Sequence, residues 1–387
     1  MTMLSLPKNF ETYDEKKKAA FLELYEAKQR GKKVVGIFCS YTPVELINAA
    51  GAVSVALCGK GEQGVADAET RLPKTLCPLI KASYGLALMD QCPFFYFSDG
   101  ILAETTCDGK KKMYELLGEI KPIHVMKLPQ GRDHALAVES WTEEIRRTAR
   151  FLEKLFDVTI TEEKLHEAIV YRNRVRRALI ELYEVGKAVP SPVSGYELTT
   201  AAEASDFHFT DDDLVEKLEG IAREFRSRVR PEGAERPRVL ITGCPTGGVR
   251  EKVIRRMEEL GVDYVCADSC SGPRTQRFMV DETGDPYRAL AERYLKINCS
   301  VMTPNEARFD DLKHLIAEYR VDGVVEVVLH GCHTFAVEAW HTMNVVQGEL
   351  GLPYLRLDTD FSPSDQGQIE TRLGAFIEMM AERRSAA

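Results

Sequence analysis

The stretch that decides the fold is residues 34–43, Val34-Val35-Gly36-Ile37-Phe38-Cys39-Ser40-Tyr41-Thr42-Pro43. Its apolar first half predicts a buried strand. Its second half predicts the start of a helix, with Thr42 as the N-cap and Pro43 as the first helical residue. Gly51 is a candidate C-cap for that helix. A buried strand that leads directly into a helix is typical of a parallel sheet covered on both faces.

The same alternation recurs along the chain in two parts. Strands are predicted over 53–57, 94–97, 123–128, 239–242, 263–266, 323–329 and 354–357. Helices are predicted over 13–31, 108–120, 249–260, 286–295, 310–319, 333–348 and 367–383. Because 387 residues exceed one ordinary hydrophobic core, we expect two or three domains.

The region between these two parts differs in composition and periodicity. The segments 140–156, 161–185 and 211–229 combine helical periodicity with dense charge, so they predict helices. Proline, serine and glycine interrupt the helices at 187–196, and 231–237 is the clearest linker. We therefore expect an α/β protein with two Rossmann-like parallel-sheet domains and a helical linker region. The expected ranges are 1–130 for the N-terminal helix and first α/β domain, 131–235 for the helical linker region, and 236–387 for the second α/β domain.

The composition excludes several functional classes. Hydrophobic and charged fractions of 44% and 29% are those of a soluble globular protein. No apolar run approaches the roughly 18 residues of a membrane span. Residues 1–18 lack the apolar core of a secretory signal, so we expect a cytoplasmic protein. The formal net charge of −9 argues against nucleic acid as a partner, because phosphate binding needs a basic surface.

The ten cysteines form two blocks, and residues 108–243 contain none. The first block is Cys39, Cys58, Cys77, Cys92 and Cys107, and the second is Cys244, Cys266, Cys270, Cys299 and Cys332. Cytoplasmic thiols stay reduced, so disulfides are not expected. The cysteines are then either buried small hydrophobic residues or ligands, and thiolates are the preferred protein ligands of iron–sulfur clusters.

The positions of the cysteines favour the ligand interpretation for most of them. Four follow predicted strands, where open parallel sheets bind ligands: Cys39, Cys244, Cys270 and Cys332. Cys77 and Cys107 directly precede helices, where the helix dipole favours a thiolate. Cys58 and Cys266 lie in or at the end of apolar strands, and core packing is the better interpretation for both. The chain has no C-x-x-C and no ferredoxin-type cysteine run.

Other motifs carry less information. The glycine-rich turn at 241–248 misses the dinucleotide pattern, and no phosphate-binding loop is present, so the chain itself is not expected to hydrolyse ATP. Three lysines at 110–112 place positive charge in the first turn of a predicted helix, where it opposes the helix dipole. Either a nearby anionic cluster or an acidic redox partner would offset this unfavourable interaction. His330 and His333 bracket Cys332, where a histidine either forms structural hydrogen bonds or transfers protons.

Three segments resemble the 2-hydroxyacyl-CoA dehydratase and benzoyl-CoA reductase family. They are 38–51, 105–115 with Cys107-Asp108-Gly109-Lys110-Lys111, and the C-terminal stretch 357–378. Dehydratase subunits of that family hold one four-iron cluster with three cysteines. The matching positions here are Cys77, Cys107 and Cys332.

The segments 76–81, 242–245 and 331–334 are more similar to one branch, the double-cubane cluster proteins. That resemblance implies an [8Fe-9S] cluster on six cysteines, with Cys244, Cys270 and Cys299 holding the second cubane. Cys39 and Cys92 are the alternatives if one of these is wrong. Because Cys332 then joins the first block's cubane, we expect both cysteine blocks to face one crevice between the domains.

The resemblance also implies a function. It predicts a low-potential iron–sulfur reductase of small unsaturated molecules, with electrons from a separate ATP-hydrolysing iron–sulfur reductase, and a homodimer. Candidate proton donors are His333, Glu326 and Glu104. One alternative is a subunit of a 2-hydroxyacyl-CoA dehydratase with a single [4Fe-4S] cluster. Another is a non-enzymatic metal-holding scaffold or electron carrier.

Overall fold

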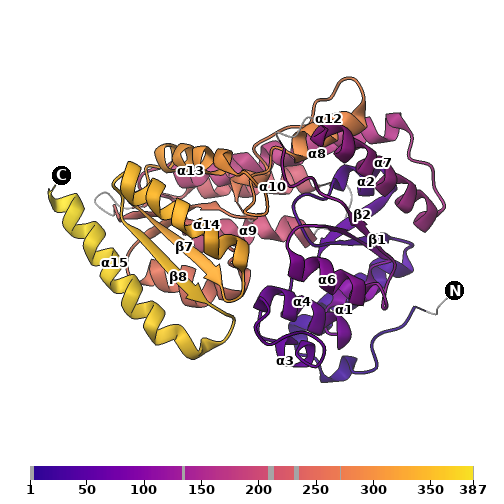
Figure 1. Ribbon diagram of the computed structural model, residues 1–387, viewed down its shortest axis with the longest axis horizontal. Helices are drawn as coiled ribbons and strands as arrows, with labels where there is room; N and C mark the ends of the chain where they lie inside the picture. Colours follow the sequence, from indigo (N-terminus) through magenta and orange to yellow (C-terminus); the bar gives the residue numbers. More distant parts are fainter. Residues whose placement is uncertain (1–3, 133–135, 208–212, 231–234, 271, 387) are drawn as a thin grey trace.

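The computed structural model describes residues 4–132, 136–207, 213–230, 235–270 and 272–386. Within these ranges the chain forms two four-stranded sheets, and neighbouring strands in both are parallel. Figure 1 shows the two sheets in separate lobes, with helices packed around each and spanning the space between them. The predicted α/β fold with two parallel-sheet domains is confirmed. Among the described helices, none is long and apolar enough to cross a membrane.

The first sheet has the strand order β2-β1-β3-β4. Its strands are β1 (Lys33–Ile37), β2 (Ala52–Ala56), β3 (Gly100–Glu104) and β4 (Ile123–Met126). The helices in this part are α1 (Glu15–Gln29), α2 (Val44–Ala49), α3 (Val65–Ala68), α4 (Pro78–Leu88), α5 (Pro93–Phe97) and α6 (Asp108–Leu117). Every residue of β3 is buried, as expected of a central strand covered by helices on both faces.

The second sheet repeats this order as β6-β5-β7-β8. Its strands are β5 (Arg238–Gly243), β6 (Asp263–Asp268), β7 (Gly323–Leu329) and β8 (Tyr354–Thr359). Its helices are α11 (Arg256–Glu259), α12 (Pro286–Tyr294), α13 (Glu306–Glu318), α14 (His333–Met343) and α15 (Gln366–Ala386). The two halves therefore share a topology, although their sequences show no residue-level repeat.

The strand order determines where a ligand can bind. In the first sheet the chain runs from β1 to the edge strand β2 and then returns as β3, which pairs with the other side of β1. In the second sheet β5, β6 and β7 follow the same path. The loops after the two central strands therefore diverge and leave a crevice at their carboxyl ends. In this protein those strands are β1 and β3 in the first sheet and β5 and β7 in the second.

The middle region bridges both domains. Its helices are α7 (Ala137–Phe156), α8 (Glu162–Glu184), α9 (Gly195–Ala204) and α10 (Leu214–Ser227). Helix α8 packs on α2 of the first domain, whereas α9 packs on β6 of the second. The predicted break at 187–196 separates α8 from α9. Of the predicted linker 231–237, residues 231–234 lie outside the described part of the chain.

Two local predictions were wrong. The segment 94–97 is helical rather than extended, because Pro93 begins α5 and the aromatic side chains pack against α1; the rings of Phe21 and Phe97 lie 5.9 Å apart. The strand that pairs with β1 at this point is the short run 100–104, which the sequence analysis did not identify. Aromatic residues favour strands in general, but tertiary packing decided otherwise here.

The helix after β1 begins one residue later than predicted. Helix α2 starts at Val44, with Pro43 in the N-cap position. The hydroxyl of Thr42 instead donates a hydrogen bond to the Glu104 carboxylate at the end of β3. Gly51 directly follows the C-cap of α2 and has a φ of +71°, in agreement with the prediction that it ends the helix.

A buried charge joins all three parts of the chain. Glu45 on α2 accepts hydrogen bonds from Arg176 on α8 and from the Tyr294 hydroxyl on α12, the latter at 2.8 Å. All three side chains are buried. Burial alone would raise the pKa of Glu45, but the guanidinium groups of Arg176 and Arg293 outweigh it and lower that pKa. The ionised carboxylate therefore fixes α12, which the second half of the chain contributes, against the first domain.

The Glu45→Ala variant leaves the Arg176 guanidinium buried without its carboxylate. We expect the free energy of unfolding to fall by about 3–5 kcal/mol, measured by urea denaturation of the anaerobically purified protein. The matched control is Glu26→Ala, because Glu26 and Arg30 form an exposed pair at 3.9 Å. Its effect is expected to stay below about 1 kcal/mol. Equal effects of the two substitutions would contradict the role of Glu45.

Candidate functional site

The structure places most of the cysteines at the predicted kinds of position. Cys244 directly follows β5, and Cys39, Cys270 and Cys332 lie in the loops after β1, β6 and β7. Cys77, Cys107 and Cys332 are the N-cap residues of α4, α6 and α14. Three thiols therefore begin helices, in positions where first-turn N–H groups point toward a bound anionic group.

Four thiols form a first group, which consists of Cys77, Cys107, Cys244 and Cys332. The Cys244 thiol hydrogen-bonds to Cys332 and thereby lowers the pKa of Cys332 to about 6. Burial, and then the neighbouring Cys332 and Cys107 thiols, raise the pKa of Cys77 to about 12. The close approach of the Cys332 turn to the loop that carries Cys77 depends on Gly331, because a Cβ atom at this position would collide with the Thr75 carbonyl oxygen. Only glycine allows the β7–α14 turn to contact the loop before α4 in this way.

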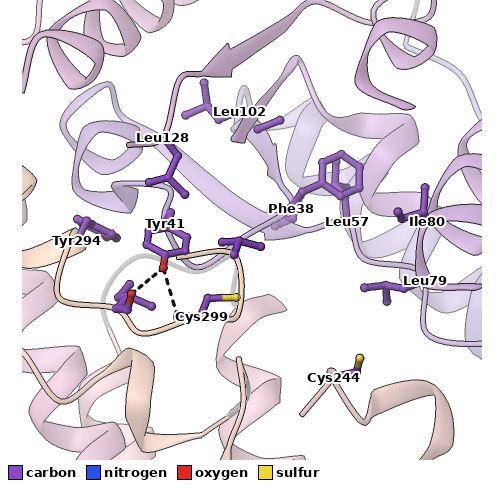
Figure 2. Close-up of a cluster of buried hydrophobic side chains, with 14 of the residues drawn as sticks. Phe38, Tyr41, Leu57, Leu79, Ile80, Leu102, Leu128, Cys244, Tyr294 and Cys299 are labelled. Atoms are coloured by element: carbon purple, nitrogen blue, oxygen red, sulfur yellow. Dashed lines mark hydrogen bonds between the residues drawn. The ribbon is translucent and has the colours of Figure 1, made fainter. Parts of the chain in front are cut away.

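A second group of thiols consists of Cys39, Cys58, Cys270 and Cys299, which interact with one another. Burial raises the pKa of Cys39, and the Glu104, Cys270 and Cys299 groups add to that rise. Tyr41 positions the Cys299 loop: its hydroxyl donates to the Ile297 carbonyl at 2.6 Å and accepts from the Cys299 N–H at 3.4 Å (Figure 2). Because Tyr41 lies between β1 and α2, the first domain holds a cysteine loop of the second half.

The charge of Lys110 interacts with thiols of both groups. Its ammonium donates to the Phe38 carbonyl at 3.1 Å. Burial opposes its charge, but the Tyr114 hydroxyl and the Cys58, Cys39 and Cys107 thiols raise the pKa of Lys110 well above its ordinary value. The other two lysines at 110–112 form ion pairs with acidic residues of their own helix at the surface. Lys110 alone among these three faces the thiols.

A cavity of about 210 Å³ opens onto the second group. Cys39, Cys58, Cys270 and Lys110 are in its wall, together with residues of the middle region such as Arg172. Cysteines of both blocks therefore line one cavity, but of the six predicted ligands only Cys270 is in its wall. The sequence analysis assigned Cys58 to core packing, although Cys58 follows its strand much as Cys39 does.

Comparison with known proteins places the chain in a family. The model of the 2-hydroxyglutaryl-CoA dehydratase D-component matches residues 39–380. The chain belongs to this dehydratase family. A relative in Escherichia coli (strain K12), named "Putative dehydratase subunit YjiM", is 43% identical over 381 residues, covering 97% of this chain and 98% of the relative.

More distant relatives of this dehydratase family member have two kinds of names. The (R)-phenyllactyl-CoA dehydratase beta subunit of Clostridium sporogenes is 23% identical over 91% of this chain and 93% of its own length. One of the subunits of benzoyl-CoA reductase from Thauera aromatica is also 23% identical, over 77% of each chain. The family thus includes subunits of dehydratases and of a reductase.

The remaining two cysteines lie elsewhere in this dehydratase family member. Cys266 is buried in β6, in a hydrophobic cluster with Leu240 and Leu312, as core packing predicts. Cys92 is the N-cap of α5, where its sulfur accepts a hydrogen bond from the Phe95 N–H at 3.4 Å. Burial raises the pKa of Cys92, and Lys17 is a charge that opposes this rise.

The three predicted proton donors lie in different environments. His333 is exposed in the first turn of α14, next to Cys332. Glu326 is buried in β7 and accepts a hydrogen bond from the Tyr354 hydroxyl at 2.6 Å. Burial raises the pKa of Glu326, but it is not among the residues lining the cavity. Neither residue therefore reaches the cavity from its present position.

Glu104 is closer to the thiols. It is fully buried at the end of β3, and burial raises its pKa to about 8 despite the hydrogen bond from Thr42. One of its carboxylate oxygens has no hydrogen-bond partner among the described residues. Thr42 lines the cavity directly, so Glu104 is separated from the cavity by one hydroxyl group. At neutral pH this carboxyl group holds a proton.

The donor set fits an iron–sulfur cluster. Two adjacent groups of four thiols supply the sulfur ligands that such clusters require, and three of these thiols begin helices. Lys110 places a positive charge where thiolates and a cluster would concentrate negative charge. In the described ranges, no group of three or more His, Cys, Asp or Glu side chains is arranged to hold a single metal ion. An iron–sulfur cluster does not require three side chains to point at a single ion, because its cysteine ligands bind different iron atoms.

The Glu104→Gln variant tests the protonation of this carboxyl group. Between its ordinary pKa near 4.5 and its folded value of about 8, the folded protein binds a proton that the unfolded chain releases. Stability therefore falls as the pH rises through this window. Between about pH 6 and about pH 8.5, we expect the free energy of unfolding of the metal-free wild-type protein to fall by about 2 kcal/mol more than that of Glu104→Gln. Urea denaturation at the two pH values measures this difference.

The control for this measurement is Glu115→Gln, because Glu115 is an exposed glutamate on the neighbouring helix α6. This control should keep the wild-type pH dependence. If Glu104→Gln keeps it too, the buried carboxyl group is not protonated at neutral pH.

Proposed function

We propose that this dehydratase family member is a low-potential iron–sulfur reductase of small unsaturated molecules that holds a double-cubane [8Fe-9S] cluster. The observation that supports the proposal is a second group of thiols near the first: Cys39, Cys58 and Cys270 line one cavity with Lys110, and the Cys107 thiol of the first group also acts on the charge of Lys110. A family subunit with one four-iron cluster needs only one of these groups. The second group is what favours the larger cluster.

Six thiols are proposed as ligands. Cys77, Cys107 and Cys332 hold the first cubane, because they share one thiol group and begin three helices. Cys270 and Cys299 contribute to the second cubane. The resemblance gives Cys244 as its third ligand, but the thiols that act on Cys244 are Cys332 and Cys77.

Cys39 is the stronger candidate for that third position. Burial and the Glu104 carboxylate raise the pKa of Cys39. The thiols that add to this rise are Cys270 and Cys299, the other two proposed ligands of the second cubane. It also lines the cavity with Cys270, whereas Cys244 does not. We therefore propose Cys39, Cys270 and Cys299 for the second cubane, with Cys244 as the alternative to Cys39.

When bound, the cluster would supply electrons at low potential for reduction of an unsaturated bond. The chain's own residues bind the substrate and supply a proton. The cavity brings a small molecule to Cys39 and Cys270. Thr42 lies in the cavity wall and hydrogen-bonds to Glu104, whose carboxyl group is protonated at neutral pH. We assign Glu104 as the donor of one of the two protons that reduction of the unsaturated bond requires: the Thr42 hydroxyl gives its hydrogen to the substrate and takes the Glu104 proton in its place, and solvent supplies the second proton.

Two partners belong to the proposal. The chain lacks a phosphate-binding loop, so a separate ATP-hydrolysing iron–sulfur reductase would deliver the electrons. A second copy of the chain would complete a homodimer. The names of the relatives, which describe subunits of larger enzymes, are consistent with partner proteins.

A second candidate function is that of a subunit in a 2-hydroxyacyl-CoA dehydratase. The family match and the name of the Clostridium sporogenes relative favour it. In that case one [4Fe-4S] cluster on Cys77, Cys107 and Cys332 would serve the elimination of water from a thioester. The thiols of the second group would then be structural.

Anaerobic iron and sulfide analysis of the purified chain tests the proposed function. We expect about eight irons per chain and a brown protein with the broad absorption of iron–sulfur clusters. About four irons, together with binding of an acyl-CoA, would support the dehydratase subunit instead. A colourless protein loaded with zinc would contradict both enzymatic functions and favour a scaffold.

Alanine variants of single cysteines test the ligand assignment. Cys270→Ala and Cys299→Ala are each expected to lose a large part of the cluster iron, because a cubane lacks a ligand in each. Cys266→Ala is the matched control, since Cys266 lies in the core of the same domain, and it should retain the iron. Cys39→Ala and Cys244→Ala are compared in the same assay, and the proposal predicts the greater loss for Cys39→Ala. Equal iron in all five variants would contradict the second cubane.

A further inference from the structure

The cavity beside the thiols has an unusual balance of charge. Five basic side chains lie in its wall: Lys60, Lys110, Arg172, Arg176 and Arg293. Asp206 is the acidic side chain among the residues that line it. Two of the cations are neutralised, because Lys60 pairs with Glu203 at 2.8 Å and Arg176 pairs with Glu45. The other three have neutral hydrogen-bond partners.

Arg172 is the most informative of these three. Its Nε donates to the side-chain oxygen of Asn48 at 2.5 Å, and one terminal nitrogen lies 3.5 Å from the Ser54 hydroxyl. Among the residues that the structure describes, no carboxylate forms an ion pair with it. Glu45 acts on its charge from a distance, but Arg176 and Tyr294 already occupy the oxygens of that carboxylate.

The acidic residue of the cavity wall does not neutralise Arg172 either. Asp206 is exposed to solvent, which screens the interaction of its carboxylate with Arg172. The Asp206 carboxylate acts on Lys60 and Arg172 without a direct hydrogen bond to Arg172 in the described part of the chain. The cavity therefore keeps an excess of positive charge.

The thiols do not account for Arg172. Lys110 is the cation that compensates the cysteines, since Cys58, Cys39 and Cys107 all act on its charge. The groups that act most on Arg172 are a carboxylate, two tyrosines and a second arginine, and no thiol is among them. The cavity therefore has a sulfur-lined end and a separate guanidinium end.

Arg172 also lies at an entrance. A second cavity of about 300 Å³ adjoins the first, and Ser54, Arg172, Ser205 and Leu214 line both. The second cavity reaches Gly51 and Lys32 at the carboxyl end of α2 and the start of the first sheet. A small molecule that enters by this route passes Arg172 before it reaches Cys39 and Cys270.

We propose that Arg172 binds the carboxylate of a small unsaturated acid, so that the substrate of this site is a short-chain carboxylate whose reducible end points toward Cys39, Cys58 and Cys270. The planar guanidinium matches a carboxylate with two parallel hydrogen bonds. An anion would give this half-buried cation an ionic partner, which the described residues do not supply. The cavity of about 210 Å³ suits an acid of a few carbon atoms. This substrate class rests on the proposed reductase function.

Binding is measured apart from turnover. Equilibrium dialysis of the anaerobically purified chain compares radiolabelled propionate with propionamide, which has the same shape but no charge and does not alkylate thiols. We expect propionate to bind at least about tenfold more tightly, because a charged hydrogen bond contributes that much. Equal affinity for the two ligands would overturn the proposal. Inorganic phosphate is the third probe, and tighter binding of phosphate than of propionate would contradict a carboxylate.

Variants on α8 locate the site. Arg172→Gln should weaken propionate binding about ten- to hundredfold, whereas Arg172→Lys should recover part of it because the charge remains without the planar fork. The matched control is Arg174→Gln, since Arg174 is exposed on the same helix and pairs with Glu216 at 3.8 Å. Unchanged binding in Arg172→Gln would exclude Arg172. These readouts need no electrons, so a failed iron analysis and a failed binding test are distinguishable.

Discussion

The arrangement of this protein depends on one buried ion pair. Glu45 on α2 binds Arg176 on α8 and the hydroxyl of Tyr294 on α12, so that all three parts of the chain meet at one carboxylate. A buried charge of this kind is tolerated only with its partners in place, which makes the geometry specific. Because α12 is fixed to the first domain, the loops that carry Cys270 and Cys299 are held beside Cys39.

The two sheets complete the site from opposite sides. Each presents the carboxyl ends of its central strands, and each of those strands leads to a cysteine: Cys39 after β1, Cys107 after β3, Cys244 after β5 and Cys332 after β7. Gly331 lets the second sheet's loop touch the backbone before Cys77. A single domain could offer only half of these thiols, so the candidate cluster site exists only when the domains are docked.

The site separates its chemical tasks in space. Thiols and Lys110 line one part of the cavity, and Arg172 lines another. The protonated carboxyl group of Glu104 is hydrogen-bonded to Thr42 in the cavity wall. Burial raises the pKa of Glu104 to about 8, and no carboxylate of the described residues forms an ion pair with Arg172. This separation is consistent with a substrate that carries charge at one end and an unsaturated bond at the other.

The alternation of strand and helix, the two sheet domains and the positions of the cysteines after strands and before helices could all be predicted from the sequence. Those features follow from local apolar patterns and capping residues, which act over a few positions. Tertiary structure alone decided that 94–97 is a helix, that 100–104 is the central strand β3, and that Cys244 lies beside Cys332. It also decided the roles of Cys58 and Arg172, because their partners lie on other elements of the fold and no local pattern records them.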